Sequence, residues 1–319
     1  MSILGRVPNR LLDVMAAFII WPTARVLRHV RDTGIEHFPR SRAAFVKSGV
    51  FPITNHYYEP LFDPKHLRKP LDQPRALPGI DWNVDEQLAT LAEMSFGAEL
   101  SETPTEKRHE HEFAFNNGFF ESGDAEFLYN MVRLKKPKRV IEIGSGNSTL
   151  LVANAIAKNR LDDSGYECEH ECIEPFEMPW LDRLPGVKLY RQRVEEVPVE
   201  RFSSLQANDI LFIDSSHMVR PQGDVLFEFL EILPTLRSGV IVHVHDIFSP
   251  MDYPKSWIID QVRFWNEQYI LEAFLSGTSN WRIIGALNFL ATNHFDALRK
   301  TCPFLTATRD PGSFWIQRR

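Results

Sequence analysis

The sequence has few cysteines and no excess of positive charge. Its three cysteines, Cys168, Cys172 and Cys302, are too few and too odd in number for a disulfide framework. This favours a reducing compartment, so we expect a cytoplasmic protein. The net charge of −6 gives no general attraction to nucleic acid, and we expect no nucleic-acid partner. With 319 residues, 44% of them hydrophobic, the chain can bury one large core or two smaller ones.

Long hydrophobic runs are also scarce. The apolar run 14–21 is far shorter than the roughly 20 residues that a membrane-spanning helix needs. Residues 1–50 carry eight Lys and Arg against three acids, a balance of +5. A basic helix with an apolar side can lie on an anionic membrane surface, so peripheral membrane contact through this helix is one interpretation. The alternative is packing on its own domain or on a second subunit, as in a homo-oligomer.

The segment before residue 120 reads as helical and irregular. Residues 51–80 contain six prolines without periodicity, which is typical of an ordered but irregular arm. Helical spacing predicts helices from Asp85, the expected cap, to residue 94 and over 123–136, the second ended by Pro137. We therefore predict an N-terminal region over 1–120 that serves as a lid or acceptor-site cap, and a cofactor-binding domain over 121–319.

Short apolar runs alternate with helical stretches in the second part of the chain, which predicts parallel strands in an α/β fold. The expected strands are 139–144, 171–175, 187–191, 209–214 and 240–246, followed by a long helix over 256–277 and two closing strands over 281–290 and 312–319. We predict a doubly wound, mostly parallel, seven-stranded Rossmann-like sheet with an N-terminal extension.

The stretch "RVIEIGSGNSTLL", residues 139–151, ends a strand in a glycine turn and begins a helix. Gly144 and Gly146 let the backbone bend and approach a ligand, and Asn147 and Ser148 offer polar groups where the free N–H groups of a helix favour a polar ligand. The position of a third glycine in a dinucleotide fingerprint is Thr149, and no G-x-x-x-x-G-K-[ST] loop is present. Both absences lower the nicotinamide and nucleotide-triphosphatase interpretations.

This stretch, with Glu174 in "CIEP", "FIDSSH" and "VHVHD", resembles the class I S-adenosylmethionine-dependent methyltransferases, especially bacterial small-molecule enzymes. The resemblance covers roughly residues 123–247. It implies S-adenosylmethionine as the cofactor, Glu174 as the residue that holds the ribose hydroxyls, and Glu195 as an adenine contact, with Glu196 as the competing choice. The turn residues Glu142, Gly144, Ser145 and Gly146 would cradle the amino-acid end of the cofactor.

Four titratable residues follow two strands that we expect to be neighbours. Asp214 and His217 come after one strand, and His245 and Asp246 after the next, so all four should meet at one rim. In one mechanism His245 or His217 acts as a general base. In the other, Asp214 and Asp246, with or without His245, hold a divalent ion such as Mg²⁺, as the resemblance to catechol-type enzymes implies. A third interpretation is that Asp214 contacts only the cofactor and His245 only the sheet edge.

The sequence therefore predicts methyl transfer from S-adenosylmethionine to a small-molecule acceptor, with a hydroxyl oxygen as the favoured acceptor atom. N-methylation is the main enzymatic alternative, because an amine needs a base or a metal less than a hydroxyl does. A cofactor-binding scaffold or partner subunit without catalysis is the alternative from a different class.

Overall fold

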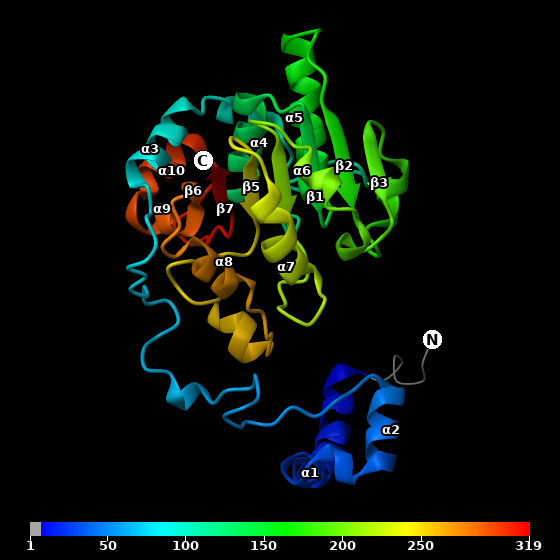
Figure 1. Cartoon of the computed structure of the whole chain (residues 1–319). Helices are drawn as coiled ribbons and strands as arrows, with labels where there is room; N and C mark the ends of the chain where they lie inside the picture. Colours follow the sequence, from blue (N-terminus) through cyan, green and yellow to red (C-terminus); the bar gives the residue numbers. More distant parts are fainter. Residues whose placement is uncertain (1–7) are drawn as a thin grey trace. The chain divides into compact units, whose positions relative to one another are not determined.

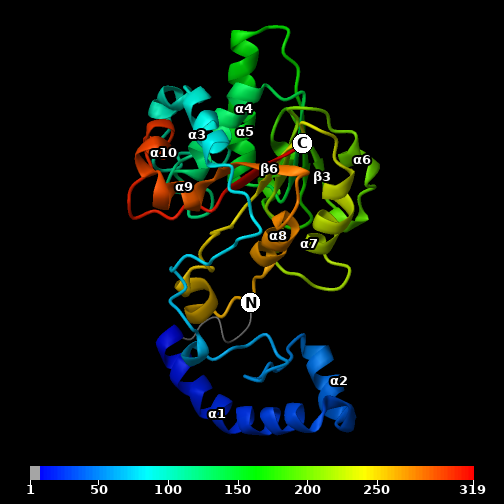
Figure 2. The ribbon, with the colours of Figure 1, turned by 60° about the vertical axis from the view of Figure 1, so that its left-hand side comes forward.

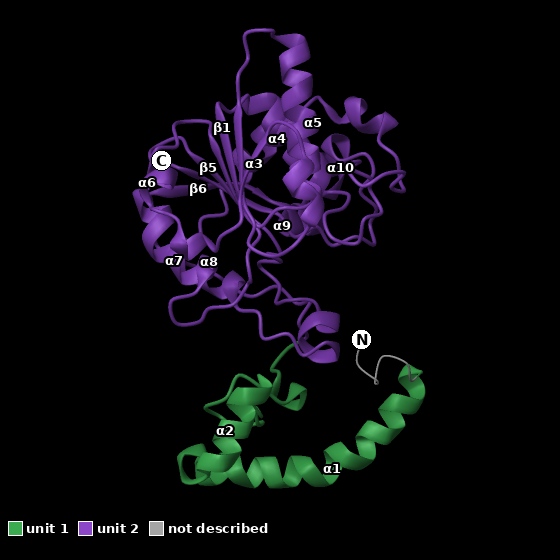
Figure 3. Ribbon diagram, turned by 90° about the vertical axis from the view of Figure 1, so that its right-hand side faces the viewer, with its two compact units in different colours: residues 1–69 green, residues 70–319 purple. Residues whose placement is uncertain are grey.

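The computed structural model describes residues 8–319 and divides the chain into two compact units, residues up to 69 and residues 70–319 (Figure 3). The first unit contains the helices α1 (Asn9–Thr33) and α2 (Pro39–Ser48). Gly34 and Gly49 follow these helices with φ angles of +105° and +68°, a region in which glycine is favoured. Among the described residues, no helix is both long and apolar enough to cross a bilayer.

A seven-stranded sheet forms the centre of the second unit (Figure 1). Its order is β3-β2-β1-β4-β5-β7-β6, and β7 runs in the opposite direction to the other six strands. The strands are β1 (Arg139–Ile143), β2 (Glu169–Ile173), β3 (Val187–Tyr190), β4 (Ile210–Ile213), β5 (Ile241–Val244), β6 (Trp281–Ala286) and β7 (Phe314–Arg318). The predicted doubly wound, mostly parallel sheet is therefore confirmed, and the order reverses beside β1, between β1 and β4.

Helices cover both faces of this sheet, as two views show (Figures 2 and 3). The helices of the unit are α3 (Val84–Glu93), α4 (Asp124–Lys135), α5 (Asn147–Asp162), α6 (Glu200–Ser203), α7 (Asp224–Phe227), α8 (Glu267–Leu275), α9 (Leu287–Asn293) and α10 (Phe295–Thr301). Residues of α4, α5, α9 and α10 share one buried apolar cluster, while those of α6, α7 and α8 share another on the opposite face. Each face of the sheet thus has its own hydrophobic core, which is why the central strand β4 is apolar throughout rather than alternating.

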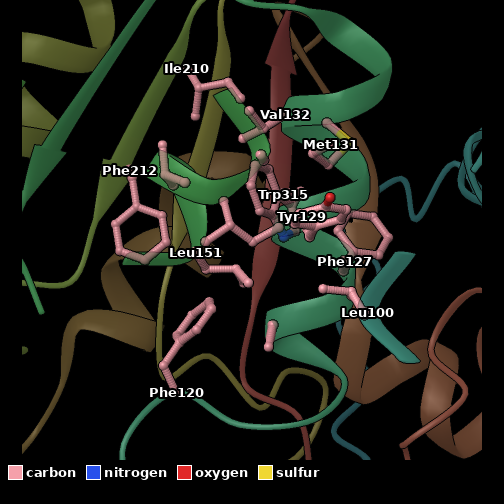
Figure 4. Close-up of a cluster of buried hydrophobic side chains, with 14 of the residues drawn as sticks. Leu100, Phe120, Phe127, Tyr129, Met131, Val132, Leu151, Ile210, Phe212 and Trp315 are labelled. Atoms are coloured by element: carbon pink, nitrogen blue, oxygen red, sulfur yellow. The ribbon is translucent and has the colours of Figure 1, made fainter. Parts of the chain in front are cut away.

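The core on the α4 face is built largely from aromatic and long aliphatic side chains (Figure 4). Phe127 and Met131 of α4 are fully buried there, and the Phe127 ring lies 5.6 Å from the ring of Trp315 on β7. Phe120 packs edge-on against Phe212 of β4 at 5.8 Å. These contacts hold α4 and the segment before it against the sheet, on the face that α5 also covers.

Several predicted boundaries differ from the structure. The helix expected over 256–277 is divided into a π-helix, Ser256–Asp260, and α8, because the chain between them is irregular and Val262 adopts a φ of +56°. The strand expected over 281–290 ends at Ala286, and α9 follows directly. The predicted cap Asp85 lies inside the first turn of α3, whose N-cap is Asn83.

The compact units also divide the chain elsewhere than at the predicted boundary near residue 120. Residues 70–120 belong to the second unit, and the fully buried Gln87 of α3 shows one reason. Its side chain accepts a hydrogen bond from Ala286 N at 2.7 Å and donates one to Trp82 O at 2.6 Å, which joins this segment to β6. The predicted role of residues 1–120 as an acceptor-site cap stays a prediction.

A buried glutamate at the beginning of α4 gives stability a defined pH dependence. Glu126 is fully buried and accepts hydrogen bonds from Gly123 N at 2.5 Å and Phe304 N at 3.1 Å. Burial raises the pKa of Glu126 to about 7, because its effect outweighs the lowering effect of these N–H donors. The folded state therefore holds a proton that the unfolded chain releases at lower pH.

We expect the free energy of unfolding to fall by about 3 kcal/mol through Glu126 as the pH rises from its ordinary pKa near 4.5 to about 7. The change should be absent in Glu126→Gln. In denaturant titrations, the difference in free energy of unfolding between wild type and variant should therefore shrink across this pH range. Glu231→Gln, at an exposed position, is the matched control. A difference that stays constant from pH 4 to 8 would contradict the assignment.

Candidate functional site

The turn after β1 is held against the end of β4 by a very close backbone approach. Gly144 has a φ of +76°, and a Cβ built on it would lie 1.8 Å from the carbonyl oxygen of Asp214. Its N–H donates to Ile173 O of β2 at 3.0 Å, and Asp214 N donates to Ile143 O at 2.8 Å. Only glycine fits at position 144. Gly146, in contrast, has an extended φ of −179°, and a Cβ there would meet only Met178, at 3.7 Å.

Glu142 supports the turn from inside the protein. Its fully buried carboxylate accepts hydrogen bonds from Ser148 Oγ at 2.9 Å and Thr149 Oγ1 at 3.0 Å, and it also pairs with His170. Glu142, His170 and Cys172 offer ligand atoms within 4.8 Å of one another, but all three are buried, and the hydroxyls and the imidazole already satisfy the carboxylate. We therefore assign Glu142 and Ser148 to the structure of the turn. Neither residue is among those that line the cavity described next, and direct contact with the cofactor stays a prediction.

A cavity of about 330 Å³ opens beyond the carboxyl ends of β1, β2 and β4. Gly144 is the only predicted turn residue that lines it; Ser145, Gly146 and Asn147 do not, and the side-chain oxygen of Asn147 instead accepts from Lys107 Nζ at 3.1 Å. The lining residues are Ile143, Gly144, Ile173, Glu174, Pro175, Phe176, Glu177, Arg193, Val194, Glu195, Asp214, Ser215, Ser216, Arg220 and Asp224. They include five carboxylates and two guanidinium groups, so the cavity favours a cationic ligand over an anionic pyrophosphate.

Glu174 lies where the sequence predicts an acidic residue, one position after β2. Its Oε1 accepts from Phe176 N at 2.9 Å and Glu177 N at 2.7 Å, and its Oε2 accepts from Ser145 N at 3.3 Å. These backbone donors fix the carboxylate at the cavity wall, where it can accept from ligand hydroxyls. Glu195 also lines the cavity whereas Glu196 does not, which favours Glu195 of the two candidates.

The four predicted rim residues come together, and three of them form a tight cluster. The ligand atoms of Asp214, His217 and Asp246, here called the rim cluster, lie within 4.8 Å of one another. His217 Nε2 is 3.4 Å from a carboxylate oxygen of each aspartate. His217 and Asp246 both have left-handed backbones, with φ angles of +59° and +57°. Such strain in residues other than glycine is typical of functional sites.

Glu267 completes this arrangement, and no motif in the sequence pointed to it. It is fully buried at the start of α8, and its Oε2 lies 2.8 Å from His217 Nδ1. Two backbone hydrogen bonds hold the start of α8 beside His217: Asn266 N and Glu267 N donate to His217 O at 3.0 and 3.2 Å. Because 50 residues separate the partners, no local pattern connects them. Glu267 orients the imidazole so that Nε2 faces Asp214 and Asp246.

The carboxylates around His217 favour a positive charge at the rim. Burial alone would lower the pKa of His217, but hydrogen bonds to Asp214 and Glu267 and the charge of Asp246 raise it well above its ordinary value. Burial likewise works to raise the pKa of Asp214, but the charge of His245 and the hydrogen bond from His217 hold it at about 2. Either a proton on the imidazole or a bound cation fits this arrangement of carboxylates.

His245 lies beside the rim cluster and outside it. Its Nε2 is 3.6 Å from Asp246 Oδ1, and its ring packs 5.0 Å from Phe120. Burial opposes a charge on the ring, but Asp246, Asp214 and Asp124 together raise the pKa of His245. His245 therefore stays a candidate general base beside the cluster that could hold a metal ion.

An aromatic cluster from the irregular chain after β5 borders the rim. The Trp265 ring lies 4.3 Å from that of His217 and 5.2 Å from that of Trp257. The guanidinium of Arg263 stacks on both tryptophans, at 4.9 and 4.3 Å. The division of the predicted long helix is what brings Trp265 to His217.

Comparisons with known proteins find a matching family model, a relative and similar solved structures. Residues 141–247 match the model of a methyltransferase domain family. An uncharacterized protein of Archaeoglobus fulgidus is 30% identical over 175 residues, which cover 50% of this chain and 76% of that protein. Among solved structures, the O-methyltransferase TomG from Streptomyces achromogenes with S-adenosylmethionine is 14% identical over 73% of this chain and 90% of its own, with a TM-score of 0.38. An O-methyltransferase from Bacillus cereus with S-adenosylhomocysteine is 11% identical over 75% and 98%, with a TM-score of 0.36.

The sheet order, the glycine turn at its reversal point and the acidic residue after β2 define a nucleoside-cofactor-binding α/β protein. With the match to the methyltransferase domain, the chain belongs to the class I S-adenosylmethionine-dependent methyltransferases.

Substitution of Glu174 tests the cofactor cavity. We expect Glu174→Ala to weaken S-adenosylhomocysteine binding by at least about tenfold, because it removes a fixed acceptor at the cavity wall. Isothermal titration calorimetry measures the loss. Glu196→Ala, which changes a glutamate outside the cavity lining, should bind as the wild type does, whereas Glu195→Ala should bind more weakly. Unchanged affinity in Glu174→Ala would contradict the role of this residue.

Proposed function

We propose that the protein methylates a hydroxyl oxygen of a small molecule, with a divalent cation bound by Asp214, His217 and Asp246. The observation that carries the proposal is that Asp214 belongs both to the cofactor cavity and to the rim cluster. The site of the methyl donor and the site of the methyl acceptor are then adjacent, as direct methyl transfer requires.

The rim cluster has the chemistry of a cation site. Two carboxylates and one imidazole offer three ligand atoms, and the imidazole is held by Glu267 in the way that metal-binding histidines are commonly oriented. An imidazole ligand suits manganese or zinc better than magnesium, which prefers oxygen alone. The test therefore includes Mn²⁺ beside the expected Mg²⁺.

The roles of the residues follow from their positions. S-adenosylmethionine supplies a methyl group on a sulfonium, and the divalent ion lowers the pKa of a bound hydroxyl. Glu174 and Glu195 hold the nucleoside part of the cofactor, and the acidic lining favours its positive charge. The rim cluster holds the acceptor oxygen. In the alternative mechanism, which needs no metal ion, His245 takes the proton of the acceptor hydroxyl. The aromatic cluster of Trp257 and Trp265 covers the acceptor side and limits the access of water.

The proposed function is tested by release of S-adenosylhomocysteine from a set of hydroxyl and amine acceptors, with Mg²⁺ or Mn²⁺ and with EDTA. Turnover of a hydroxyl compound that EDTA removes and the metal restores would support the proposal. Turnover of amines alone, unaffected by EDTA, would contradict it and favour N-methylation.

Loss of metal ligands provides a test without an acceptor. We expect Asp246→Asn and His217→Ala each to weaken Mn²⁺ binding by at least about tenfold, because each removes one of three ligands. Titration followed by electron paramagnetic resonance measures binding directly. Asp260→Asn, at an exposed position paired with Lys255, is the matched control. Wild-type affinity in both ligand variants would exclude the rim cluster as the metal site.

Glu267 should act through His217. We expect Glu267→Gln to reduce Mn²⁺ affinity about 10- to 100-fold, as is usual when the partner that orients a metal-bound histidine is changed. S-adenosylhomocysteine affinity should stay unchanged, because Glu267 does not line the cofactor cavity. An equal loss of both affinities would indicate a purely structural role.

A further inference from the structure

The helix α1 turns its apolar side away from the rest of the first unit. Val30 is buried, and Leu12, Ala16 and Leu27 on the same side are half-buried. The large apolar side chains that stay exposed on α1 are Leu11, Val14, Met15, Phe18, Ile19, Ile20, Trp21 and Val26. Phe18 is 79% exposed and Ile19 68% exposed. A monomeric soluble protein rarely leaves such a continuous apolar surface uncovered, so this surface marks an interaction site.

Charge is divided unequally between the two units. Residues 1–69 contain 11 Lys and Arg against 5 Asp and Glu, a balance of +6, whereas the remaining residues carry 25 against 37, a balance of −12. The basic residues accompany the exposed apolar side chains. The guanidinium of Arg25 lies 4.0 Å from the ring of Trp21, and Arg10 and Arg28 are exposed on the same helix.

A second patch in the same unit repeats this composition. On α2 and just after it, Val46 and Val50 are 67% and 65% exposed, with Lys47 between them. The first unit thus combines exposed aliphatic and aromatic groups with a positive charge on both of its helices. This is the composition of segments that lie in the interface of anionic membranes, where apolar side chains enter the acyl boundary and basic ones meet the headgroups.

We propose that the first unit binds the surface of membranes containing anionic lipid, with α1 lying in the interface and Phe18 and Trp21 inserted. Two copies of a unit that carries +6 repel each other, which disfavours pairing of this surface with itself. An anionic lipid surface satisfies the apolar groups and the basic groups together. The second unit, with its balance of −12, is repelled by the same surface, so we expect the first unit alone to bind it.

Co-sedimentation of the full-length protein with lipid vesicles tests this proposal. We expect binding to phosphatidylserine–phosphatidylcholine vesicles, little binding to pure phosphatidylcholine, and loss of binding at high salt. The double variant Phe18→Glu/Trp21→Glu should bind at least about tenfold more weakly, because it removes two inserted side chains and adds repulsion. Leu161→Glu, which changes an 80% exposed leucine on α5, is the matched control and should bind as the wild type does.

Circular dichroism and thermal unfolding of each variant show whether the protein is folded, and Arg25→Glu/Arg28→Glu tests the charge independently of the apolar groups. Failure of the wild type to bind anionic vesicles would overturn the proposal, as would equal binding to vesicles without anionic lipid. A wild type that is dimeric by light scattering and does not bind vesicles, with a monomeric Phe18→Glu/Trp21→Glu variant, would show that a second copy covers this surface instead.

Discussion

The contact between Gly144 and the backbone of Asp214 is the constraint on which the site depends. A side chain at position 144 would lie 1.8 Å from the Asp214 carbonyl oxygen, so the ends of β1 and β4 can approach this closely only through glycine. The approach fixes two things together. It turns the chain after β1 sharply into α5 along the cofactor cavity, and it sets the position of Asp214, which lines that cavity and also begins the rim cluster.

The second feature of the site is an excess of buried negative charge. Asp214, Asp246 and Glu267 surround one imidazole, and Asp124 acts on the neighbouring His245. Buried carboxylates without a counter-charge are costly, and a proton on the imidazole or a bound cation offsets this cost at the rim. The raised pKa of His217 follows from this arrangement. The same acidity in the cofactor cavity suits a sulfonium and disfavours a dinucleotide.

Sequence patterns were reliable where the structure is local. The strand β1, its glycine turn and the first turns of α5 follow from a stretch of 13 residues, and Glu174 follows from its place after the second strand. Patterns failed where neighbours come from distant segments. Helical periodicity predicted one helix over 256–277, but hydrogen bonds to His217 O begin α8 anew at Glu267. Likewise Gln87 ties residues 70–120 to β6, a connection between segments 199 residues apart.

The sequence by itself determined the class of fold and the group of four residues at the rim, because strand periodicity, a glycine turn and residues at strand ends are short-range signals. Its resemblance to the class I methyltransferases implied the cofactor. Only the tertiary structure decided where each of these residues lies and which groups it contacts. It set Glu142 and Ser148 beneath the turn rather than at the cavity, separated His245 from the rim cluster, and supplied Glu267 as the partner of His217. These roles depend on which side chains meet after burial, and burial is a property of the packed chain rather than of any local segment.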